Sequence, residues 1–328
     1  MKKILLTGCA GFIGSNFVKS IATKEKDYQF VILDALTYAG HYPTIQNDVE
    51  GNDHLSFVQM DIRDKDKIQK LFDDEKFDGV IHFAAESHVD NSIKNPNIFV
   101  ETNVLGTLNL LNSSISLGKV DFKFVHVSTD EVYGTLSEED PAFTELNPIE
   151  PNSPYSASKA SSDLLVRSYY ETYKLNTVIT RCSNNYGPYQ FPEKLIPVMI
   201  SNALEDKALP VYGDGRNIRD WIYVDDHNRG VWATFLKGKA GEAYNFGGNA
   251  EKRNLEVVKT LLSILNKPES LITFVEDRKG HDWRYAMDYS KAKTELGFEP
   301  QVTFEEGMKK TVDWYLENTA WCKEVKKG

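Results

Sequence analysis

The stretch KILLTGCAGFIGSNF (residues 3–17) joins a short apolar run to a glycine-rich turn and then to an amphipathic pattern. Its glycines, Gly8, Gly11 and Gly14, are spaced G-x-x-G-x-x-G. Glycine allows a tight turn and a close backbone approach that a side chain would prevent. We therefore predict a strand over residues 3–7, a turn at the glycines and a helix directly after them.

Five more apolar runs of strand length follow, and helix-length patterns separate them. The runs cover residues 30–34, 55–59, 79–85, 122–128 and 177–180. They are rich in Val, Ile and Phe and apolar on both faces, which is typical of a parallel sheet covered by helices on both sides. The alternation predicts an α/β fold with a Rossmann-type, doubly wound parallel sheet.

The pattern loosens after about residue 181 into clusters of Gly, Pro and Asn. Helical patterns recur near residues 192–205, 254–265 and 304–317. We expect residues 1–181 to form a sheet domain and residues 182–328 to form most of a smaller C-terminal lobe, with the chain able to cross between them. A binding cleft is expected between the two lobes.

Asp34 lies 20 residues after Gly14, at the end of the second predicted strand. A carboxylate there can accept hydrogen bonds from ribose hydroxyls, and the amide groups at the start of the first helix suit a pyrophosphate. This combination favours a dinucleotide site over a glycine-rich turn that binds no ligand. Because Asp34 would repel a 2′-phosphate, we predict NAD rather than NADP. Further contacts are expected at later strand ends, near Asp61 and Ile62 and along FAAES (residues 83–87).

Two neighbouring carboxylates, Asp130 and Glu131, stand in STDEVYG (residues 128–134), where an apolar run ends. Successive residues of a strand point to opposite faces. Both carboxylates can therefore reach one small molecule only if the strand already turns at Asp130. The alternative makes Asp130 a helix N-cap and Glu131 a solvated neighbour.

Tyr155 and Lys159 stand four residues apart in YSASK, on one face of a predicted helix. An ammonium group near a phenol lowers the pKa of the phenol and lets it act as a base toward an alcohol. The same spacing occurs in two other pairs, Tyr170 with Lys174 and Tyr289 with Lys293, where an exposed helix face is explanation enough. Only Tyr155 opens the helix that follows STDEVYG, so we assign catalysis to this pair.

Composition narrows the class of protein. The chain has 328 residues, 41% of them hydrophobic and 26% charged, and a formal net charge of -10. The negative charge argues against nucleic acid as a partner, and no apolar run approaches the ~20 residues of a membrane span. The cysteines, Cys9, Cys182 and Cys322, are scattered, so we expect no metal site and reduced thiols in the cytoplasm.

Longer motifs extend this reading along nearly the whole chain. They are FAAESHVDNSI (83–93), STDEVYG, SPYSASKASSD (153–163), RCSNNYGPYQFPEKLIP (181–197), VYGDGRNIRDWIYVDDH (211–227) and DRKGHDWRYAMD (277–288). With the glycine turn and Y-x-x-x-K they resemble the extended short-chain dehydrogenase/reductase family, and within it the dTDP-glucose 4,6-dehydratase family. Lys279, where proline is usual, and Cys9, where glycine is common, depart from that pattern.

The resemblance implies a reaction and a role for each catalytic residue. Tyr155, supported by Lys159, would take the proton of the C4 hydroxyl of dTDP-glucose while NAD accepts hydride. Glu131 would then remove the C5 proton, Asp130 would protonate the departing C6 oxygen, and Thr129 would hold the C4 oxygen. Hydride return to C6 gives dTDP-4-keto-6-deoxyglucose and water, a product that feeds sugars such as rhamnose.

The resemblance also implies two sets of binding residues. The cofactor set is Gly8, Gly11, Phe12, Ile13, Gly14, Asp34, Ala35, Leu36, Thr37, Asp61, Ile62, Phe83, Ala84, Ala85, Ser87, Thr102, Tyr155, Lys159 and Asn185. The substrate set is Ser87, Thr129, Asn184, Lys194, Leu195, Tyr212, Arg219, Asn254, Arg278 and His281. Guanidinium groups suit a diphosphate, although either arginine could instead be a surface ion pair and His281 a core histidine. A homodimer would pair the helices near residues 102–117 and 155–173.

Two rival functions remain. A nucleotide-sugar 4-epimerase or decarboxylase would share the scaffold, but an epimerase needs no acid and base for C5 and C6, so Asp130 and Glu131 speak against it. A non-catalytic dinucleotide sensor would keep the glycine turn but typically lose the tyrosine or lysine. The preference for a thymidine nucleotide rests on the resemblance alone.

Overall fold

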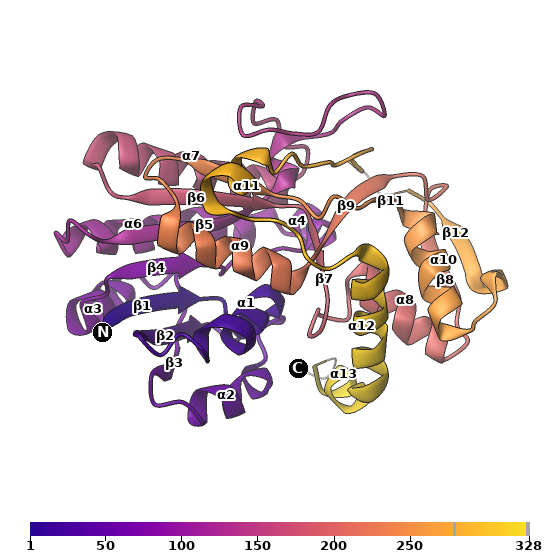
Figure 1. Ribbon diagram of the computed structural model, residues 1–328, viewed down its shortest axis with the longest axis horizontal. Coiled ribbons are helices and arrows are strands. Elements are labelled where there is room, and N and C mark those ends of the chain that lie inside the picture. The colour runs from indigo at the N-terminus through magenta and orange to yellow at the C-terminus, as the bar shows by residue number, and fades with distance from the viewer. Residues whose placement is uncertain (278–279, 326–328) are drawn as a thin grey trace.

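The large lobe is built on a seven-stranded sheet. The computed structural model describes residues 1–277 and 280–325, so Arg278 and Lys279 lie outside the described residues. Strand order is β10-β6-β5-β4-β1-β2-β3, and all neighbouring strands are parallel (Figure 1). The strands are β1 (Lys2–Thr7), β2 (Tyr28–Asp34), β3 (Leu55–Gln59), β4 (Gly79–His82), β5 (Lys123–Thr129), β6 (Thr177–Cys182) and β10 (Ala243–Phe246). The predicted Rossmann-type sheet is confirmed.

Helices cover both faces of this sheet because its strands are apolar on both sides. Ile4 and Leu6 of β1 belong to one buried cluster with Phe17 and Trp232, whereas Leu5 belongs to another on the opposite face. The first face carries α1 (Phe12–Phe17), η1 (Val18–Ala22) and α9 (Val224–Lys237), and the second carries α3 (Lys65–Glu75), α6 (Thr107–Ser116) and α7 (Pro154–Tyr173). Burial on two sides fixes the strands in a three-layer core.

The small lobe packs three helices against two short sheets. Its strands are β7 (Asn184–Tyr186), β9 (Ile218–Tyr223) and β11 (Glu251–Arg253) in one sheet and β8 (Leu209–Tyr212) with β12 (Ile272–Val275) in the other. Its helices are α8 (Leu195–Leu204), α10 (Asn254–Leu265) and α12 (Phe304–Glu317), which Figure 1 shows grouped beside the large sheet. The helical patterns predicted at residues 254–265 and 304–317 match α10 and α12.

Short helices complete the connections. They are η2 (Tyr42–Thr44), α2 (Gln46–Glu50), α4 (Val89–Lys94), α5 (Pro96–Phe99), η3 (Val100–Gly106), η4 (Asp130–Tyr133), η5 (Glu269–Leu271), α11 (Ser290–Leu296) and α13 (Thr319–Val325). Two elements that follow residue 181, α9 and β10, belong to the large sheet, so the chain does cross between the lobes. Among the described residues, no helix combines the length and apolar character needed to cross a membrane.

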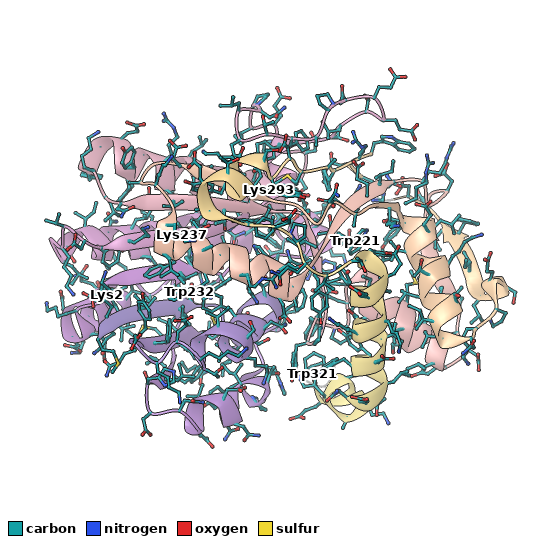
Figure 2. All side chains as sticks on the ribbon, in the orientation of Figure 1. Lys2, Trp221, Trp232, Lys237, Lys293 and Trp321 are labelled. Atoms are coloured by element: carbon teal, nitrogen blue, oxygen red, sulfur yellow. The ribbon has the colours of Figure 1, made fainter. Side chains whose placement is uncertain are left out.

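An aromatic cluster joins α13 to the large lobe. Figure 2 shows Trp321 between the C-terminal helices and the N-terminal part of the chain. Its indole nitrogen donates to the hydroxyl of Thr44 at 2.8 Å, across 277 residues of sequence. The ring lies 5.1 Å from Trp314 and 5.7 Å from Tyr189. Tyr189 precedes a segment that borders the main cavity, so this cluster links the two lobes beside that cavity.

Removing this link should cost measurable stability. We expect Trp321→Phe and Thr44→Val each to lower the free energy of unfolding by about 1 kcal/mol, because each deletes the interlobe hydrogen bond. The double variant should lose less than the sum, since both changes remove the same contact. Urea unfolding of the four proteins measures the coupling, and strictly additive losses would contradict it.

Candidate active site

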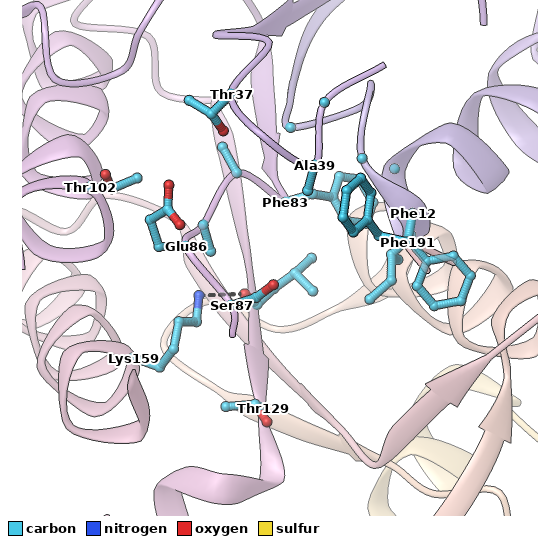
Figure 3. A pocket seen from close by; sticks show the side chains of 18 of the residues that line it. Phe12, Thr37, Ala39, Phe83, Glu86, Ser87, Thr102, Thr129, Lys159 and Phe191 are labelled. Atoms are coloured by element: carbon cyan, nitrogen blue, oxygen red, sulfur yellow. Dashed lines mark hydrogen bonds between the residues drawn. The ribbon is translucent and has the colours of Figure 1, made fainter. Parts of the chain in front are cut away.

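A cavity of about 320 Å³ lies at the carboxyl ends of the central strands. The strand order reverses between β1 and β4, and ligands of open parallel sheets bind at such a reversal. Figure 3 shows Phe12, Thr37, Ser87, Thr129 and Lys159 around this cavity. Segments that are far apart in the sequence therefore meet at one edge of the sheet.

Most of the predicted site residues border this cavity. Those that do are Gly8, Gly11, Phe12, Ile13, Gly14, Asp34, Ala35, Thr37, Asp61, Ile62, Phe83, Ala84, Ala85, Ser87, Thr102, Thr129, Asp130, Glu131, Tyr155, Lys159, Asn184, Asn185 and Lys194. Those that do not are Leu36, Leu195, Tyr212, Arg219, Asn254 and His281. Arg278, also predicted, lies outside the described residues.

The three glycines serve different purposes. A Cβ on Gly8 would lie 2.5 Å from Ala84 Cα, and a Cβ on Gly14 would lie 2.6 Å from Cys9 Cα, so chain packing alone requires glycine at both positions. A Cβ on Gly11 would meet only Gly8 O, at 3.3 Å, although Gly11 borders the cavity. The space beside Gly11 is thus kept free for a ligand, which fits a dinucleotide pyrophosphate.

Asp34 presents a buried carboxylate to the same cavity. Its two oxygens accept hydrogen bonds from the amides of Ala10 at 2.8 Å and Leu36 at 2.9 Å. Each oxygen keeps a lone pair for a further donor. Burial raises the pKa of Asp34, and the two amides partly offset this. The arrangement fits ribose hydroxyls, and Leu36 contributes through its backbone, which explains why its side chain does not border the cavity.

The chain turns at Asp130, which is the condition for Asp130 and Glu131 to reach one cavity. Strand β5 ends at Thr129 and the 3-10 helix η4 begins at Asp130, so both Asp130 and Glu131 reach the cavity. The predicted turn is confirmed. Thr129, not Asp130, is the N-cap of η4, and its hydroxyl accepts from the amide of Glu131 at 3.4 Å. The alternative that made Asp130 a cap is wrong.

Asp130 is held in a setting that favours its protonated form. Its side chain is buried, and the Thr129 hydroxyl donates to Oδ1 at 3.3 Å. Oδ2 has no hydrogen-bond partner within the described part of the chain. Burial, followed by the charge of Glu131, raises the pKa of Asp130 well above its usual range, and Arg219 offsets this only in part. A carboxyl group in this state can donate a proton near neutral pH.

Tyr155 and Lys159 lie on the first turns of α7, whose N-terminus is capped by Ser153. The ammonium of Lys159 donates to Val127 O at 2.8 Å, and burial lowers its pKa to about 8. Burial and the charge of Glu131 raise the pKa of Tyr155 well above its usual value, although a hydrogen bond with Thr129 lowers it. The expectation of a lowered phenol pKa is therefore wrong for the protein alone, because Lys159 bonds to a carbonyl in a dry site.

The other two Tyr/Lys pairs make ordinary surface contacts. The ammonium of Lys174 lies 5.4 Å from the ring centroid of Tyr170, and Lys293 pairs with Glu299 at 2.8 Å. Neither tyrosine borders the main cavity. These contacts agree with the interpretation that spacing alone does not mark a catalytic pair.

Arg219 is buried in the small lobe. Its guanidinium lies 4.3 Å from the ring centroid of Tyr285 and donates to the carbonyls of Ile218 at 2.7 Å and Asp282 at 2.9 Å. The surface ion pair considered above is thus wrong for Arg219, because its side chain is only 4% exposed. Its charge still acts on Asp130, so Arg219 lies near the catalytic carboxyls.

The remaining small-lobe residues lie beyond the cavity. His281 Nδ1 is 2.6 Å from Asp277 Oδ1, and its ring centroid is 6.3 Å from that of Tyr212. The amide of Asn254 donates to Asn217 O at 3.0 Å at the start of α10, and Leu195 opens α8. The structure therefore separates a cavity set from a small-lobe set.

Several cavity residues were missed in the sequence. They are Leu33, Ala39, Gly40, Met60, Arg63, Val127, Ser128, Cys182, Ser183, Gln190, Phe191 and Glu193. Most lie within or next to the motifs quoted above, directly after a strand. Taking each whole strand end, rather than its polar residues alone, would have found them.

Comparisons with known proteins agree with this geometry. Residues 5–311 match the family described as GDP-mannose 4,6 dehydratase. The dTDP-glucose 4,6-dehydratase of Neisseria meningitidis is 50% identical over 100% of this chain and 97% of that protein. That of Escherichia coli is also 50% identical, over 99% and 96% of the two chains. The crystal structure of the Streptomyces venezuelae dTDP-glucose 4,6-dehydratase with NAD bound is 47% identical, with a TM-score of 0.93 over 98% of this chain and 99% of that one.

Sugar epimerases share the fold at lower identity. The UDP-glucose 4-epimerase of Thermotoga maritima is 30% identical, with a TM-score of 0.88 over 97% of this chain and 99% of that one. The scaffold alone therefore does not separate dehydration from epimerisation, and the residues of the site must do so.

Burial of Asp130 should make the protein less stable as pH rises. A carboxyl whose pKa is raised in the folded state contributes its full stability below the unfolded pKa of about 3.9 and loses it as pH rises through the folded pKa. Asp130→Asn should therefore gain stability at pH 7 relative to the parent, on the order of 1.4 kcal/mol for each unit of the pKa shift. Urea unfolding across pH measures this gain. The matched exposed variant Asp140→Asn should show none, and an equal gain in both would contradict the argument.

Proposed function

This chain belongs to the dTDP-glucose 4,6-dehydratase family of extended short-chain dehydrogenases/reductases, and we propose that Thr129, Asp130, Glu131, Tyr155 and Lys159 are its catalytic residues. It is an NAD-dependent enzyme that converts dTDP-glucose to dTDP-4-keto-6-deoxyglucose and water. The observation that carries the residue assignment is that all five side chains border one cavity with the glycine turn and Asp34.

The cavity fits the cofactor through its own residues. Gly11 leaves space for the pyrophosphate, and Asp34 offers two oxygens to a ribose. When bound, NAD supplies an acceptor that removes hydride from C4 and later returns it to C6. Its oxidised ring would also carry a positive charge, which would favour the phenolate form of Tyr155.

Each catalytic side chain has one step in the proposed reaction. Tyr155 takes the proton from the C4 hydroxyl once its phenol is ionised, and the Thr129 hydroxyl steadies the C4 oxygen. The C5 proton then lies next to a carbonyl and becomes acidic. Glu131 removes that proton, and Asp130, kept protonated by burial, donates to the departing C6 oxygen. An epimerase would have no use for this acid and base.

We propose that the nucleotide diphosphate extends from this cavity into the small lobe. Ser87, Asn184 and Lys194 border the cavity, and Lys194 donates to Ser87 O at 2.9 Å. Leu195, Tyr212, Arg219, Asn254 and His281 would continue the site. Arg278, predicted with them, lies outside the described residues. Arg219 already stacks on Tyr285, which supports a fixed guanidinium near the substrate.

The elimination step gives a direct test. Glu131→Gln should lose dehydration by at least about a thousandfold, because an amide cannot act as the base, while bound NAD should still be reduced by substrate. NADH absorbance follows the oxidation, and absorbance of the product in alkali follows dehydration. The exposed control Glu139→Gln should behave as the parent does. Unchanged dehydration by Glu131→Gln would refute the assignment.

We further propose that the protein acts as a homodimer through η3 and α7. These elements pack side by side and expose large apolar side chains: Val100 and Leu105 on η3, Leu164 and Tyr173 on α7. Apolar residues gathered on adjacent helices are typical of an interface between subunits. We also place the enzyme in the cytoplasm, where its substrate and NAD are found and where cysteine thiols stay reduced.

A charge in this face should separate the subunits. Leu164→Glu should give a monomer, because burying an unpaired carboxylate in an apolar interface is costly. Leu146→Glu, at a loop position that is 95% exposed, is the matched control and should leave the assembly unchanged. Sedimentation velocity measures both, and a Leu164→Glu protein that sediments as the parent does would rule out this interface.

A further inference from the structure

A second buried carboxylate stands behind the catalytic lysine. Asp163 follows Lys159 by four residues on α7, so the two side chains leave the same helix face. Asp163 is 1% exposed, and its Oδ2 accepts from Arg181 Nε at 2.8 Å. Within the described residues, Oδ1 has no hydrogen-bond partner, and it lies 3.4 Å from His126 Nε2. One oxygen of Asp163 is therefore left unused by its ion pair and faces the lysine side.

His126 fills the space between this carboxylate and Lys159. Its Nε2 lies 3.4 Å from Lys159 Nζ and 3.2 Å from Ser162 Oγ, and the ring centroid is 5.3 Å from that of His82. Burial lowers the pKa of His126 to about 4, so the ring is neutral at neutral pH. Because a neutral ring nitrogen either donates or accepts, Nε2 can bond to the ammonium or to the carboxylate but not to both. The ring therefore separates the two charges by the width of one nitrogen atom rather than by water.

The charge on Lys159 is finely balanced. Burial lowers its pKa to about 8, and the charge of Asp163 opposes that fall. Asp163 itself stays ionised, because Arg181 and His126 outweigh burial and hold its pKa near about 2. The ionisable groups whose charges act on Lys159 are Asp163 on α7, His126 on β5, His82 on β4 and Cys182 on β6, and Arg181 on β6 acts on His126 and Asp163 in turn.

We propose that Asp163, whose charge acts across the His126 ring, is a positioning residue that keeps the Lys159 ammonium charged beside the catalytic cavity. This inference rests on the proposed roles of Tyr155 and Lys159. In this proposal Asp163 touches neither sugar nor cofactor. It determines instead which member of the Tyr155 and Lys159 pair carries a charge.

Asp163 would determine which of two groups, Tyr155 or Lys159, gives up a single proton. When the Tyr155 and Lys159 pair loses one proton, it can leave an ammonium with a phenolate, or an amine with a phenol. Asp163 lies on the lysine side, so its negative charge favours the ammonium with the phenolate, which is the reactive form. Neutralising Asp163 favours the amine with the phenol, which cannot accept the C4 proton.

The test compares Asp163→Asn with its parent in the NAD-loaded protein. Both carry Glu131→Gln, so that only C4 oxidation is followed. We expect the high-pH limb of the oxidation rate to move down by about one pH unit, which lowers the rate by about fivefold at pH 8 and by about tenfold well above pH 8. The Tyr155 phenolate signal, measured as an ultraviolet difference against Tyr155→Phe, should shrink. Removing an anion would by direct repulsion alone enlarge that signal, so the sign is decisive.

Controls separate this role from a structural one. Asp163→Glu keeps the negative charge, so it should return the high-pH limb of the oxidation rate most of the way to its position in the parent. Tyr133→Phe removes the hydroxyl that accepts from Arg181 at 2.8 Å on the far side of the network, and it should lower stability without moving the limb. His126→Phe keeps the Asp163 and Arg181 ion pair. It should shift the high-pH limb of the oxidation rate in the same direction as Asp163→Asn does. It therefore provides a second test if Asp163→Asn folds poorly.

The possible outcomes distinguish a failure of the Asp163 proposal from a failure of the catalytic assignment. A wild-type limb and phenolate signal in both Asp163→Asn and His126→Phe would overturn this inference alone. Full oxidation activity in Lys159→Met or Tyr155→Phe would instead overturn the catalytic assignment on which it rests.

Discussion

Removal of water from ionisable groups at the end of β5 is the constraint on which the site depends. Burial is the largest influence on Asp130, Tyr155 and Lys159, and it favours the uncharged form of each. For Asp130 this is the form that the proposed reaction uses. The proposed roles of Tyr155 and Lys159 need the charged forms, which charges elsewhere in the site must favour. Under this proposal burial alone supplies the acid, whereas the base also depends on nearby charges.

The parallel sheet makes this dry edge possible. Strands covered on both faces end at one level, and the first side chains beyond them are partly shielded by helices. Gly8 and Gly14 let β1, β4 and α1 approach closely, and Gly11 keeps the remaining space open. The cofactor and the catalytic residues therefore share one cavity because of packing, before any specific contact is made.

The sequence was most informative where local pattern and burial agree. The six strands predicted before residue 181 and helices α10 and α12 were found within a few residues, because their apolar runs are long and regular. Strand β10 was missed, since AYNF is only four residues long and joins the sheet through a partner far away in sequence. The cavity residues were predicted from strand ends and from resemblance. The raised pKa of Tyr155 and the place of Asp163 behind Lys159 depend on three-dimensional burial, which spacing does not reveal.

The contact between Trp321 and Thr44 also has a consequence for how the enzyme is made. Chains emerge from the ribosome starting at the N-terminus, and early domains can begin to fold before the rest is complete. The segment after β2 must wait for 277 more residues before its tryptophan partner is translated. All seven strands of the large sheet are translated before Trp321, since the last of them, β10, ends at Phe246. The hydrogen bond between Trp321 and Thr44 is therefore among the last contacts that can form during synthesis.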